Sequence, residues 1–318
     1  MSRNLHLHLI RLSVLAAGLA ATAFGSSAQA ETIYGVTEVG NRLVSFDSAA
    51  PTALLSGTAI TGLAAGEDVI GIDFRPNALS PGGAGPNVPA PGTGTLFGLG
   101  SQSNLYAIDR TTGAATRVGV GFNTPALNGS AFSFDFNPTI DRIRSVADTN
   151  VNLVLNPNSG GSAAFTNVFY PAGDPNQGAD PNIVHSAYTN SFLGSTTSQL
   201  YGIDAGLDIL VTQANNTGTL GTVGALGADI TSLGGFDISG ATGIAYLVAL
   251  VGGDNASTLW SVDLATGQAS FVNYTPDASS IGGGTRLSAI AVIPEPSTAL
   301  LLGLGLVGLR GIRRPRCD

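Results

Sequence analysis

Residues 95–113, TLFGLGSQSNLYAIDRTTG, contain the pattern that decides the fold. Two short apolar segments, 95–99 and 104–109, are separated by polar residues, and a turn sequence that ends in Gly113 follows them. Glycine at the end of such a turn supplies a positive φ, and Asp109 at its start can accept hydrogen bonds from backbone donors. The stretch therefore predicts strands joined by hairpin connections.

The second of these strands recurs five times along the chain. Its leucines are separated by 62, 48, 54 and 52 residues, and a Pro/Gly-rich insertion at 77–94 lengthens the first gap. A similar apolar strand precedes each copy, and a turn like 109–113 follows three of the five. The period is therefore close to 50 residues. The five leucines are Leu43, Leu105, Leu153, Leu207 and Leu259.

A further strand opens each unit, which makes four strands per unit. Units of this kind with a period near 45 or 50 residues are typical of β-propellers. The last opening strand has no partner after it and the first strands, from Thr32, have none before them, so the two ends complete one blade and remove both free edges. We expect an all-β, five-bladed propeller over residues 31–293; an open sandwich, a solenoid or a sixth blade are the alternatives. The opening strands are clear at 69–74, 131–136 and 233–238 and weaker at 185–190 and 286–292.

The N-terminal residues 1–30 have the three zones of a signal peptide. Arg3 and Arg11 are basic, 12–24 is apolar, and Ala28 and Ala30 form an A-x-A cleavage site before Glu31. We therefore predict a signal helix that the secretion machinery recognises and signal peptidase removes. The alternative is a retained membrane helix, which the short apolar run does not favour because the bilayer core is about 30 Å thick.

The C-terminal residues 294–318 begin with Pro294-Glu295-Pro296, continue with the apolar stretch 298–309 and end in an arginine cluster. These three parts in this order resemble the PEP-CTERM sorting signal of Gram-negative bacteria. The resemblance implies a short apolar helix that tethers the protein to the inner membrane until an exosortase processes it, followed by a cell-surface or extracellular location. An ordinary single-pass anchor is the alternative. The cluster consists of Arg310, Arg313, Arg314 and Arg316.

The charge of residues 31–296 argues against a nucleic-acid partner. This stretch has seven arginines, no lysine and 20 acidic residues, which gives a net charge of −13. An acidic surface repels phosphate backbones. Cys317 is the only cysteine and lies in the tail, so the propeller has neither a disulfide nor a thiol nucleophile.

Asp73, Asp135 and Asp237 occupy the same place in three opening strands and are the candidate site residues. If these strands are innermost, the carboxylates could bind Ca²⁺, which prefers several oxygen ligands. They could also act as acid and base on a sugar. The structural alternative is a repeated hydrogen bond to a neighbouring backbone amide, or an ion pair with Arg75.

No other motif indicates a catalytic residue or a cofactor. His185 is the only histidine of residues 31–293 and cannot form a multi-histidine metal site. The G-x-G-x-x-G string 303–308 lies in the apolar tail, without the strand that dinucleotide binding requires. The acidic loop 174–180 lacks the bidentate glutamate of a calcium loop and is expected to be a surface turn.

The segments 71–76, 134–138, 141–144 and 200–204 resemble an uncharacterised bacterial family of propeller-like exported proteins, a domain of unknown function. This resemblance implies no activity. Together with the tail and the acidic charge, it favours a non-catalytic binding or structural protein of the cell surface or extracellular matrix, associated with exopolysaccharide. The alternative function is a propeller hydrolase that acts on a glycan or lactone through its channel carboxylates, with calcium.

Overall fold

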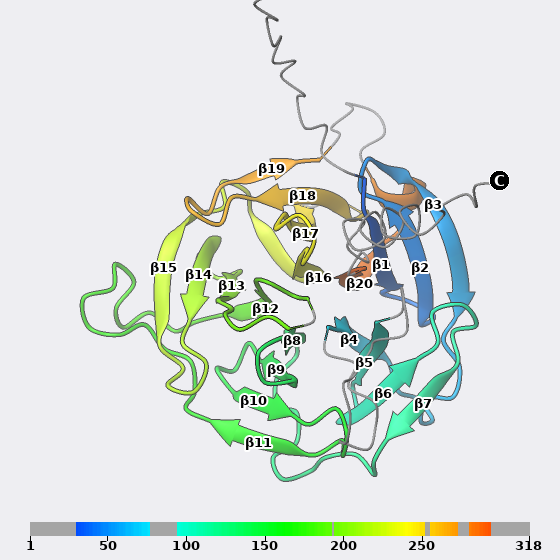
Figure 1. Cartoon of the computed structure of the whole chain (residues 1–318). Coiled ribbons are helices and arrows are strands. Elements are labelled where there is room, and N and C mark those ends of the chain that lie inside the picture. Colours follow the sequence, from blue (N-terminus) through cyan, green and yellow to red (C-terminus); the bar gives the residue numbers. More distant parts are fainter. Residues whose placement is uncertain (1–29, 77–93, 193, 252–254, 273–279, 294–318) are drawn as a thin grey trace, which may run out of the picture.

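The computed structural model describes residues 30–76, 94–192, 194–251, 255–272 and 280–293. Five antiparallel sheets of four strands surround a common axis, like the blades of a propeller (Figure 1). The expected five-bladed propeller is therefore confirmed. The predicted signal helix and the predicted tail helix lie outside the described residues.

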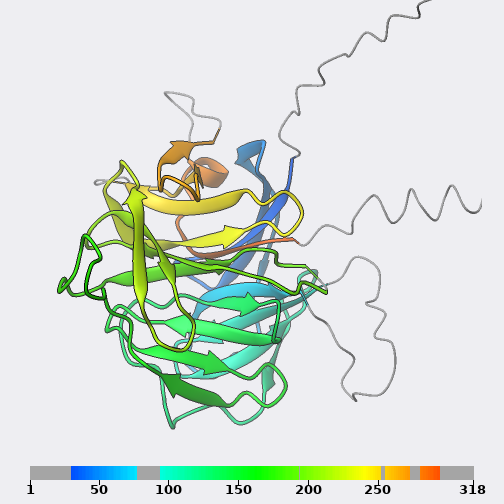
Figure 2. The ribbon, with the colours of Figure 1, turned by 60° about the vertical axis from the view of Figure 1, so that its left-hand side comes forward.

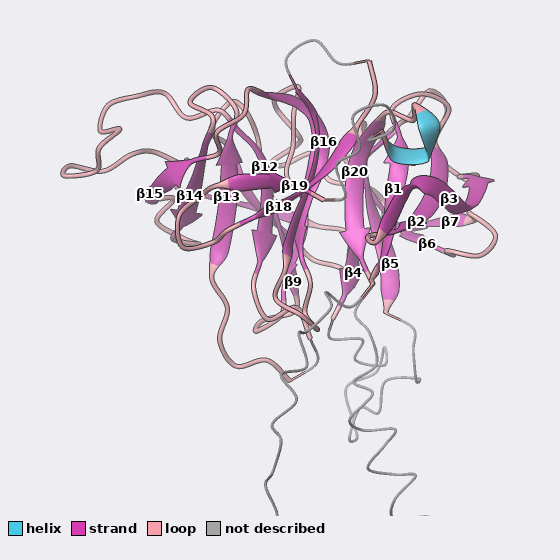
Figure 3. Cartoon of the chain, turned by 90° about the horizontal axis from the view of Figure 1, so that it is seen from above, coloured by secondary structure: helices cyan, strands magenta, loops and turns pink. Residues whose placement is uncertain are grey.

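Each blade runs from an inner strand at the axis to an outer strand at the rim (Figure 1). Figures 2 and 3 show the same ring from two other sides. Blade 1 has the order β20 (Leu287–Val292), β1 (Thr32–Thr37), β2 (Arg42–Asp47) and β3 (Ala50–Ala59), and blade 2 has β4 (Val69–Arg75), β5 (Thr95–Gly100), β6 (Asn104–Ile108) and β7 (Ala115–Val118). Blade 3 has β8 (Asp135–Asn137), β9 (Arg142–Val146), β10 (Asn152–Leu155) and β11 (Ser162–Phe165). Blade 4 has β12 (Ile183–Tyr188), β13 (Leu200–Asp204), β14 (Ile209–Gln213) and β15 (Leu220–Ala225), and blade 5 has β16 (Ile230–Ile238), β17 (Ala245–Val251), β18 (Thr258–Val262) and β19 (Ala269–Phe271).

Blade 1 closes the ring with strands from both ends of the chain. The C-terminal strand β20 pairs with β1 from Ile33 opposite Val292 to Val36 opposite Ala289. β1 is therefore paired on both sides, by β20 and by β2, and the two ends of the chain complete one blade. This is the closure that the unmatched strands at the two ends predict.

Packing between neighbouring blades forms the core. One cluster joins strands of blades 1 and 2, with Val36, Leu96 and Ala289 among its members, and another joins blades 1 and 5 through Phe46 and Leu259. The inner and middle strands, such as β4, β5, β12 and β17, are buried along most of their length, whereas the outer strands β3 and β11 are largely exposed. Burial of this kind is the main favourable term in folding.

The repeat assignment was wrong in blade 4. Leu207 was aligned with the leucines of the other blades, but it lies in the turn between β13 and β14 and is exposed. Leu210 takes the buried place instead, opposite Ile203. The turn forms at 204–208 because the Asp204 carboxylate accepts the backbone N–H groups of Gly206 and Leu207.

The only helix among the described residues is one 3-10 turn at Ile281–Gly283, which packs beside β3. Within the described ranges, no helix has the length and apolar character needed to cross a bilayer. The predicted sorting tail is not part of these ranges.

Candidate functional site

The inner strand of every blade has one residue at the same point beside the axis, which we call the axial position. It is aspartate in blades 2, 3 and 5 and alanine in blades 4 and 1. The strand registers align these residues, because each lies opposite the same place in the second strand of its blade. In blade order, the axial residues are Ala291, Asp73, Asp135, Ala187 and Asp237.

The three axial aspartates converge on the axis. One carboxylate oxygen from each lies within 4.8 Å of the other two. All three residues are buried, with 1–3 % of their surface exposed. The structure thus brings together the three aspartates that the repeat singled out, and we call them the axial triad.

Three hydrogen bonds of the axial triad connect one blade to the next. In blades 3, 4 and 1, the residue after the axial position donates its backbone N–H to the aspartate of the preceding blade. Each bond satisfies a buried donor that inner-strand pairing leaves free. The donors are Phe136 to Asp73 at 2.7 Å, Tyr188 to Asp135 at 2.9 Å, and Val292 to Asp237.

Blades 2 and 5 follow a blade whose axial residue is alanine, so the preceding blade offers no carboxylate to their backbone N–H groups. Their own aspartates accept the bond instead, from Phe74 to Asp73 and from Ile238 to Asp237, each at 2.6 Å. Three carboxylates thus satisfy the equivalent N–H group of all five inner strands. Asp73 and Asp237 each use both oxygens for this purpose, whereas Asp135 uses Oδ1.

The environment of the axial triad favours protonated carboxyl groups. Burial raises the pKa of Asp73 well above its ordinary value, and the nearby Asp237 raises it further. Burial, followed by Asp73 and Asp237, does the same to the pKa of Asp135. Burial also raises the pKa of Asp237, to about 6. Carboxylates this close cannot all be ionised unless a positive charge compensates them.

Blade 4 departs from the other blades beside the axial triad. The residue before the axial position is apolar in the other four blades and is Ser186 here; the residue before that is glycine, serine or alanine elsewhere and is His185 here. Both side chains are more than nine-tenths buried. His185 Nε2 and Ser186 Oγ have no hydrogen-bond partner among the described residues. Burial lowers the pKa of His185 to about 4, so the ring is neutral at pH 7.

These two side chains line a cavity of about 20 Å³ on the axis, to which all five blades contribute. A space of this size holds one water molecule or one ion. A sugar ring does not fit, since small-molecule sites measure about 300 Å³ or more. The channel carboxylates therefore give the hydrolase alternative no support.

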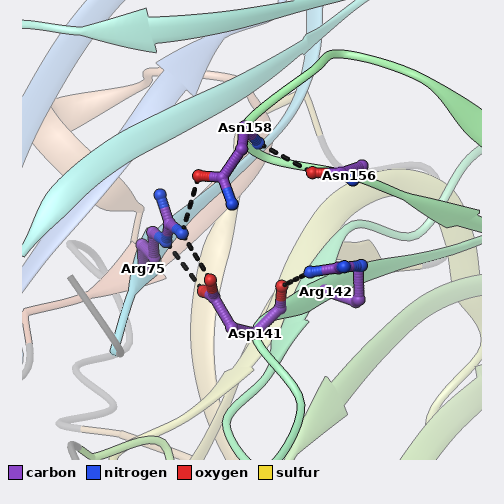
Figure 4. A network of polar contacts seen from close by, with 5 residues as sticks. All are labelled: Arg75, Asp141, Arg142, Asn156 and Asn158. Atoms are coloured by element: carbon purple, nitrogen blue, oxygen red, sulfur yellow. Dashed lines mark hydrogen bonds and ion pairs between the residues drawn. The ribbon is translucent and has the colours of Figure 1, made fainter. Parts of the chain in front are cut away.

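Arg75 does not pair with the axial triad, although the sequence made it a candidate partner. Its guanidinium forms an ion pair with Asp141 of blade 3 and donates to Asn158 Oδ1 at 2.9 Å (Figure 4). Arg142 Nη1 donates to the backbone oxygen of Asp141, and the N–H of Asn158 donates to the side chain of Asn156 (Figure 4). This cluster joins blades 2 and 3.

A second buried arginine, Arg144, is not singled out by any motif of the sequence. It lies opposite Asp135 in the sheet of blade 3, is 2 % exposed, and forms no ion pair among the described residues. Its Nη1 donates to Asn152 Oδ1 at 2.9 Å, and its Nε has no partner in the described part of the chain. The repeat carried a signal: the equivalent second-strand residues of the other blades are all aromatic, namely Tyr34, Phe97, Tyr201 and Tyr246.

Arg144 connects the axial region to the surface between blades 3 and 4, because its backbone lies opposite Asp135 and its guanidinium contacts Phe165. Its guanidinium lies 5.3 Å from the centre of the Phe165 ring, which is partly exposed at the end of β11. The linker after β11 is fixed to blade 4, because Phe169 donates its N–H to Gly218 O at 3.0 Å. Gly218 has φ 67°, and a Cβ there would lie 2.4 Å from the carbonyl oxygens of the linker. The exposed residues here, which we call the 3/4 rim, are Phe165, Thr166, Asn167, Phe169, Asn216 and Thr217.

Glu31, the predicted first residue after signal cleavage, is buried against blade 5. Its carboxylate accepts hydrogen bonds from Ser239, Thr242 and Tyr246, the last two at 2.9 Å. Its backbone N–H donates to Ser48 Oγ at 2.9 Å. The start of the described propeller is thus held to blade 5 by its side chain.

The other predicted sites lie in turns or outside the described residues. Asp174 accepts the N–H groups of Asn176 and Thr222, which fits the expected surface turn. The cleavage residue Ala28, the sorting motif Pro294–Pro296, the arginines of the tail and Cys317 lie outside the described residues. Ala30 is exposed at the start of the described chain.

Similarities to solved structures were found at low sequence identity. The chain resembles a structure from a nidogen/laminin complex (10 % identity, TM-score 0.46, 83 % of this chain and 98 % of that one). It also resembles a Bacteroides thetaiotaomicron protein of unknown function (13 %, 0.47, 82 % and 70 %) and Myxococcus xanthus glutaminyl cyclase (11 %, 0.42, 72 % and 87 %). Similarities this loose carry no conclusion about activity. No curated protein matches the chain.

Two family descriptions match the chain. The PEP-CTERM protein-sorting motif matches residues 292–314, and it marks the chain as an exported, exosortase-sorted protein of the membrane or cell surface. The domain of unknown function DUF4394 matches residues 89–284, which is more than half of the sequence. The chain is therefore a member of the DUF4394 family that carries a PEP-CTERM sorting motif.

Proposed function

We propose that this chain is a non-catalytic binding or structural protein of the cell surface or extracellular matrix, and that it binds polysaccharide at the 3/4 rim. The signal peptide over 1–30, with cleavage after Ala30, brings it across the membrane. The tail over 294–318 tethers it until the exosortase acts. The 3/4 rim is the observation that carries the binding role.

The 3/4 rim has the composition of a sugar-binding surface. Phe165 and Phe169 are 36 % and 43 % exposed, and asparagine and threonine side chains surround them. Aromatic rings stack on the apolar faces of sugars, while amides and hydroxyls bond to their hydroxyl groups. Arg144 contacts Phe165 from within the blade, which restricts that ring before a ligand arrives.

The charge of the 3/4 rim favours a neutral polysaccharide. The segments 162–173 and 209–228 contain no charged residue, whereas residues 31–296 have a net charge of −13. An acidic polysaccharide would be repelled by the rest of the surface. A neutral glycan meets no such repulsion and can use the rim directly.

Binding to a neutral glucan tests this proposal. The probe is dextran, with alginate as the acidic comparison, and binding is followed by affinity electrophoresis of the purified protein. We expect dextran to retard the native chain, and Phe165→Ala with Phe169→Ala to weaken that binding at least tenfold. Phe192→Ala is the matched control, because Phe192 is 45 % exposed in a different loop. Equal retardation of the rim variant and the control contradicts the assignment of the rim.

The host's own matrix provides the second test. Extracted exopolysaccharide fractions replace dextran in the same assay, and the same variants are compared. Absence of binding by the native chain to every matrix fraction removes the polysaccharide role altogether. Binding that the rim variant retains would keep the role but place it elsewhere on the surface.

A further inference from the structure

Hydrogen bonds within the ring leave two features of the axis unexplained: the negative charge of the axial triad and the unpartnered polar side chains of blade 4. The backbone N–H groups account for the position of the three carboxylates, but they supply no full positive charge. Neither ion pair among the described residues involves the triad. The guanidinium of Arg144, opposite Asp135, is one buried positive charge against three carboxylates, so the triad still needs a proton or a cation on the axis.

The spacing of the triad fits a calcium-sized ion. Three oxygens that all lie within 4.8 Å of one another share a point no more than about 2.8 Å from each. Calcium binds oxygen at about 2.3–2.6 Å, so a small contraction completes the contact. Magnesium requires about 2.0–2.1 Å and near-ideal octahedral geometry, which demands a larger contraction of rigid inner strands.

A second observation points to a ligand in the same channel. His185 Nε2 and Ser186 Oγ are buried and lack partners in the described part of the chain, and both residues are among those that line the axial cavity. Ile72, Phe134 and Phe236, which directly precede the three aspartates, line the same cavity, so it lies next to the triad along the axis. Buried polar atoms without partners are rare and usually indicate a water molecule or ion. A cation needs more oxygens than the three carboxylates provide, and a water in this cavity can supply one.

From this geometry we propose that the ring axis binds one calcium ion, with Asp73, Asp135 and Asp237 as ligands and with a water that His185 and Ser186 hold in the adjacent cavity. The ion joins blades 2, 3 and 5 at their inner strands. This site is separate from the 3/4 rim, so it does not rest on the proposed function.

Asp135→Asn is the sharpest variant for this site. Asp135 accepts its backbone bond through Oδ1 alone, and an asparagine can keep that bond to Tyr188. Asp73 and Asp237 use both oxygens, so the same change there would replace an acceptor by a donor that faces another donor. Asp263→Asn is the matched control, because Asp263 lies in an exposed turn and accepts the N–H groups of Ala265 and Thr266 through Oδ1.

The experiment uses purified protein that has been unfolded in chelator and refolded at pH 7.5. Bound calcium is measured by elemental analysis after refolding with Ca²⁺, and affinity is measured by calorimetry. We expect about one calcium per native chain, at least tenfold weaker binding for Asp135→Asn, and native affinity for Asp263→Asn. Ser186→Ala should weaken binding less than Asp135→Asn, and it keeps the test decisive if the first variant does not fold.

Three outcomes overturn the proposal. One is a native chain that refolds without retaining calcium. Another is equal affinity in Asp135→Asn and Asp263→Asn. The third concerns thermal unfolding, in which we expect calcium to raise the melting temperature of the refolded native chain; an equal rise with Na⁺ at matched ionic strength assigns the effect to screening. If the native chain retains no calcium, protonation of the axial triad explains how its buried carboxyl groups lie so close together.

Discussion

The axis of the ring and the 3/4 rim differ in charge, in exposure and in what their side chains bind. At the axis, three carboxylates are buried and accept backbone N–H groups from all five inner strands. At the rim, two phenylalanines and several amide and hydroxyl groups face solvent without any charge. The axis therefore connects blades to one another, whereas the rim is available to a partner. Substitutions at the two places should change different properties.

The largest effect is expected at Asp237. Replacement by alanine leaves two buried N–H groups without an acceptor, those of Ile238 and Val292. An unsatisfied buried donor costs about 1–3 kcal/mol, so Asp237→Ala should lower the free energy of unfolding by about 4 kcal/mol. Asp135→Ala frees only the N–H of Tyr188 and should cost about half as much. Denaturant unfolding measures both free energies. Equal losses in the two variants would contradict the idea that stability depends on the number of N–H groups left without an acceptor.

The two buried arginines provide the next test. Removing one partner of a buried ion pair is destabilising by about 3–5 kcal/mol, and because Arg75 and Asp141 keep some exposure we expect about 3 kcal/mol for Arg75→Met. Arg144→Phe restores the aromatic residue that the other blades have at this place and leaves no carboxylate newly unpaired. Its free energy of unfolding should stay within about 1 kcal/mol of the native value. A loss as large as that of Arg75→Met would show that the charge of Arg144 is needed for folding.

The pH dependence of stability is expected to be smaller, because two effects oppose each other. The pKa of each triad aspartate is raised in the folded state, so their contribution is complete below about pH 4 and is lost as the pH rises through the raised pKa values, which for Asp237 is about 6. The pKa of His185 is lowered to about 4, so its contribution is lost as the pH falls below about 6.5. In chelator, three carboxyl groups outweigh one imidazole, and the melting temperature should fall as the pH rises from 4 to 7.

His185→Gln separates the two effects. It removes the opposing imidazole and should steepen the fall of the melting temperature between pH 4 and 7 in chelator. The same series with Asp135→Asn should be flatter than the native one. Thermal scans at each pH measure both slopes. A native melting temperature that rises over this interval shows that the triad is not protonated in acid.

The smallest effect on stability is expected at the 3/4 rim. Phe165 and Phe169 are partly exposed, so alanine at Phe169 should change the free energy of unfolding by about 0.5 kcal/mol or less. Phe165→Ala also removes the contact with Arg144 and should cost about 1 kcal/mol. Denaturant unfolding checks both values alongside the dextran assay. A large loss of unfolding free energy in Phe169→Ala would show that Phe169 stabilises the fold and is not a free surface residue.

The repeats made most of the fold predictable from sequence. Alternating strands and Gly-ending turns set four strands per unit, and the unmatched ends predicted the closure by β20 and β1. Leu207 was misplaced because its turn, capped by Asp204, resembles the start of a strand when only apolar residues are counted. Leu210, two residues into β14, has the role that Leu207 was given.

The site was predictable only in part. The repeat identified Asp73, Asp135 and Asp237, because one residue type at one place in three strands is visible in a sequence. Three of the five backbone donors to these aspartates belong to the next blade, and the other two follow the aspartate in its own strand. A single sequence does not show this division, because it depends on which blade follows one with an axial alanine in the closed ring. His185 and Arg144 gain significance from being exceptions to their repeat positions, and their burial cannot be read from one sequence without the register.

The closure of the ring also decides how the domain responds to mechanical force. The match to the sorting motif begins at residue 292, the last residue of β20, so a tail held in a membrane would pull on the innermost strand of blade 1. A pull along that strand loads its hydrogen bonds to β1 together, in shear, instead of opening them one at a time. The Asp237 carboxylate holds the amide of Val292, the last residue of the strand, from the neighbouring blade. We therefore expect force on the tail to be shared by these bonds, so that a tethered chain could bear drag from its surroundings before β20 separates from blade 1.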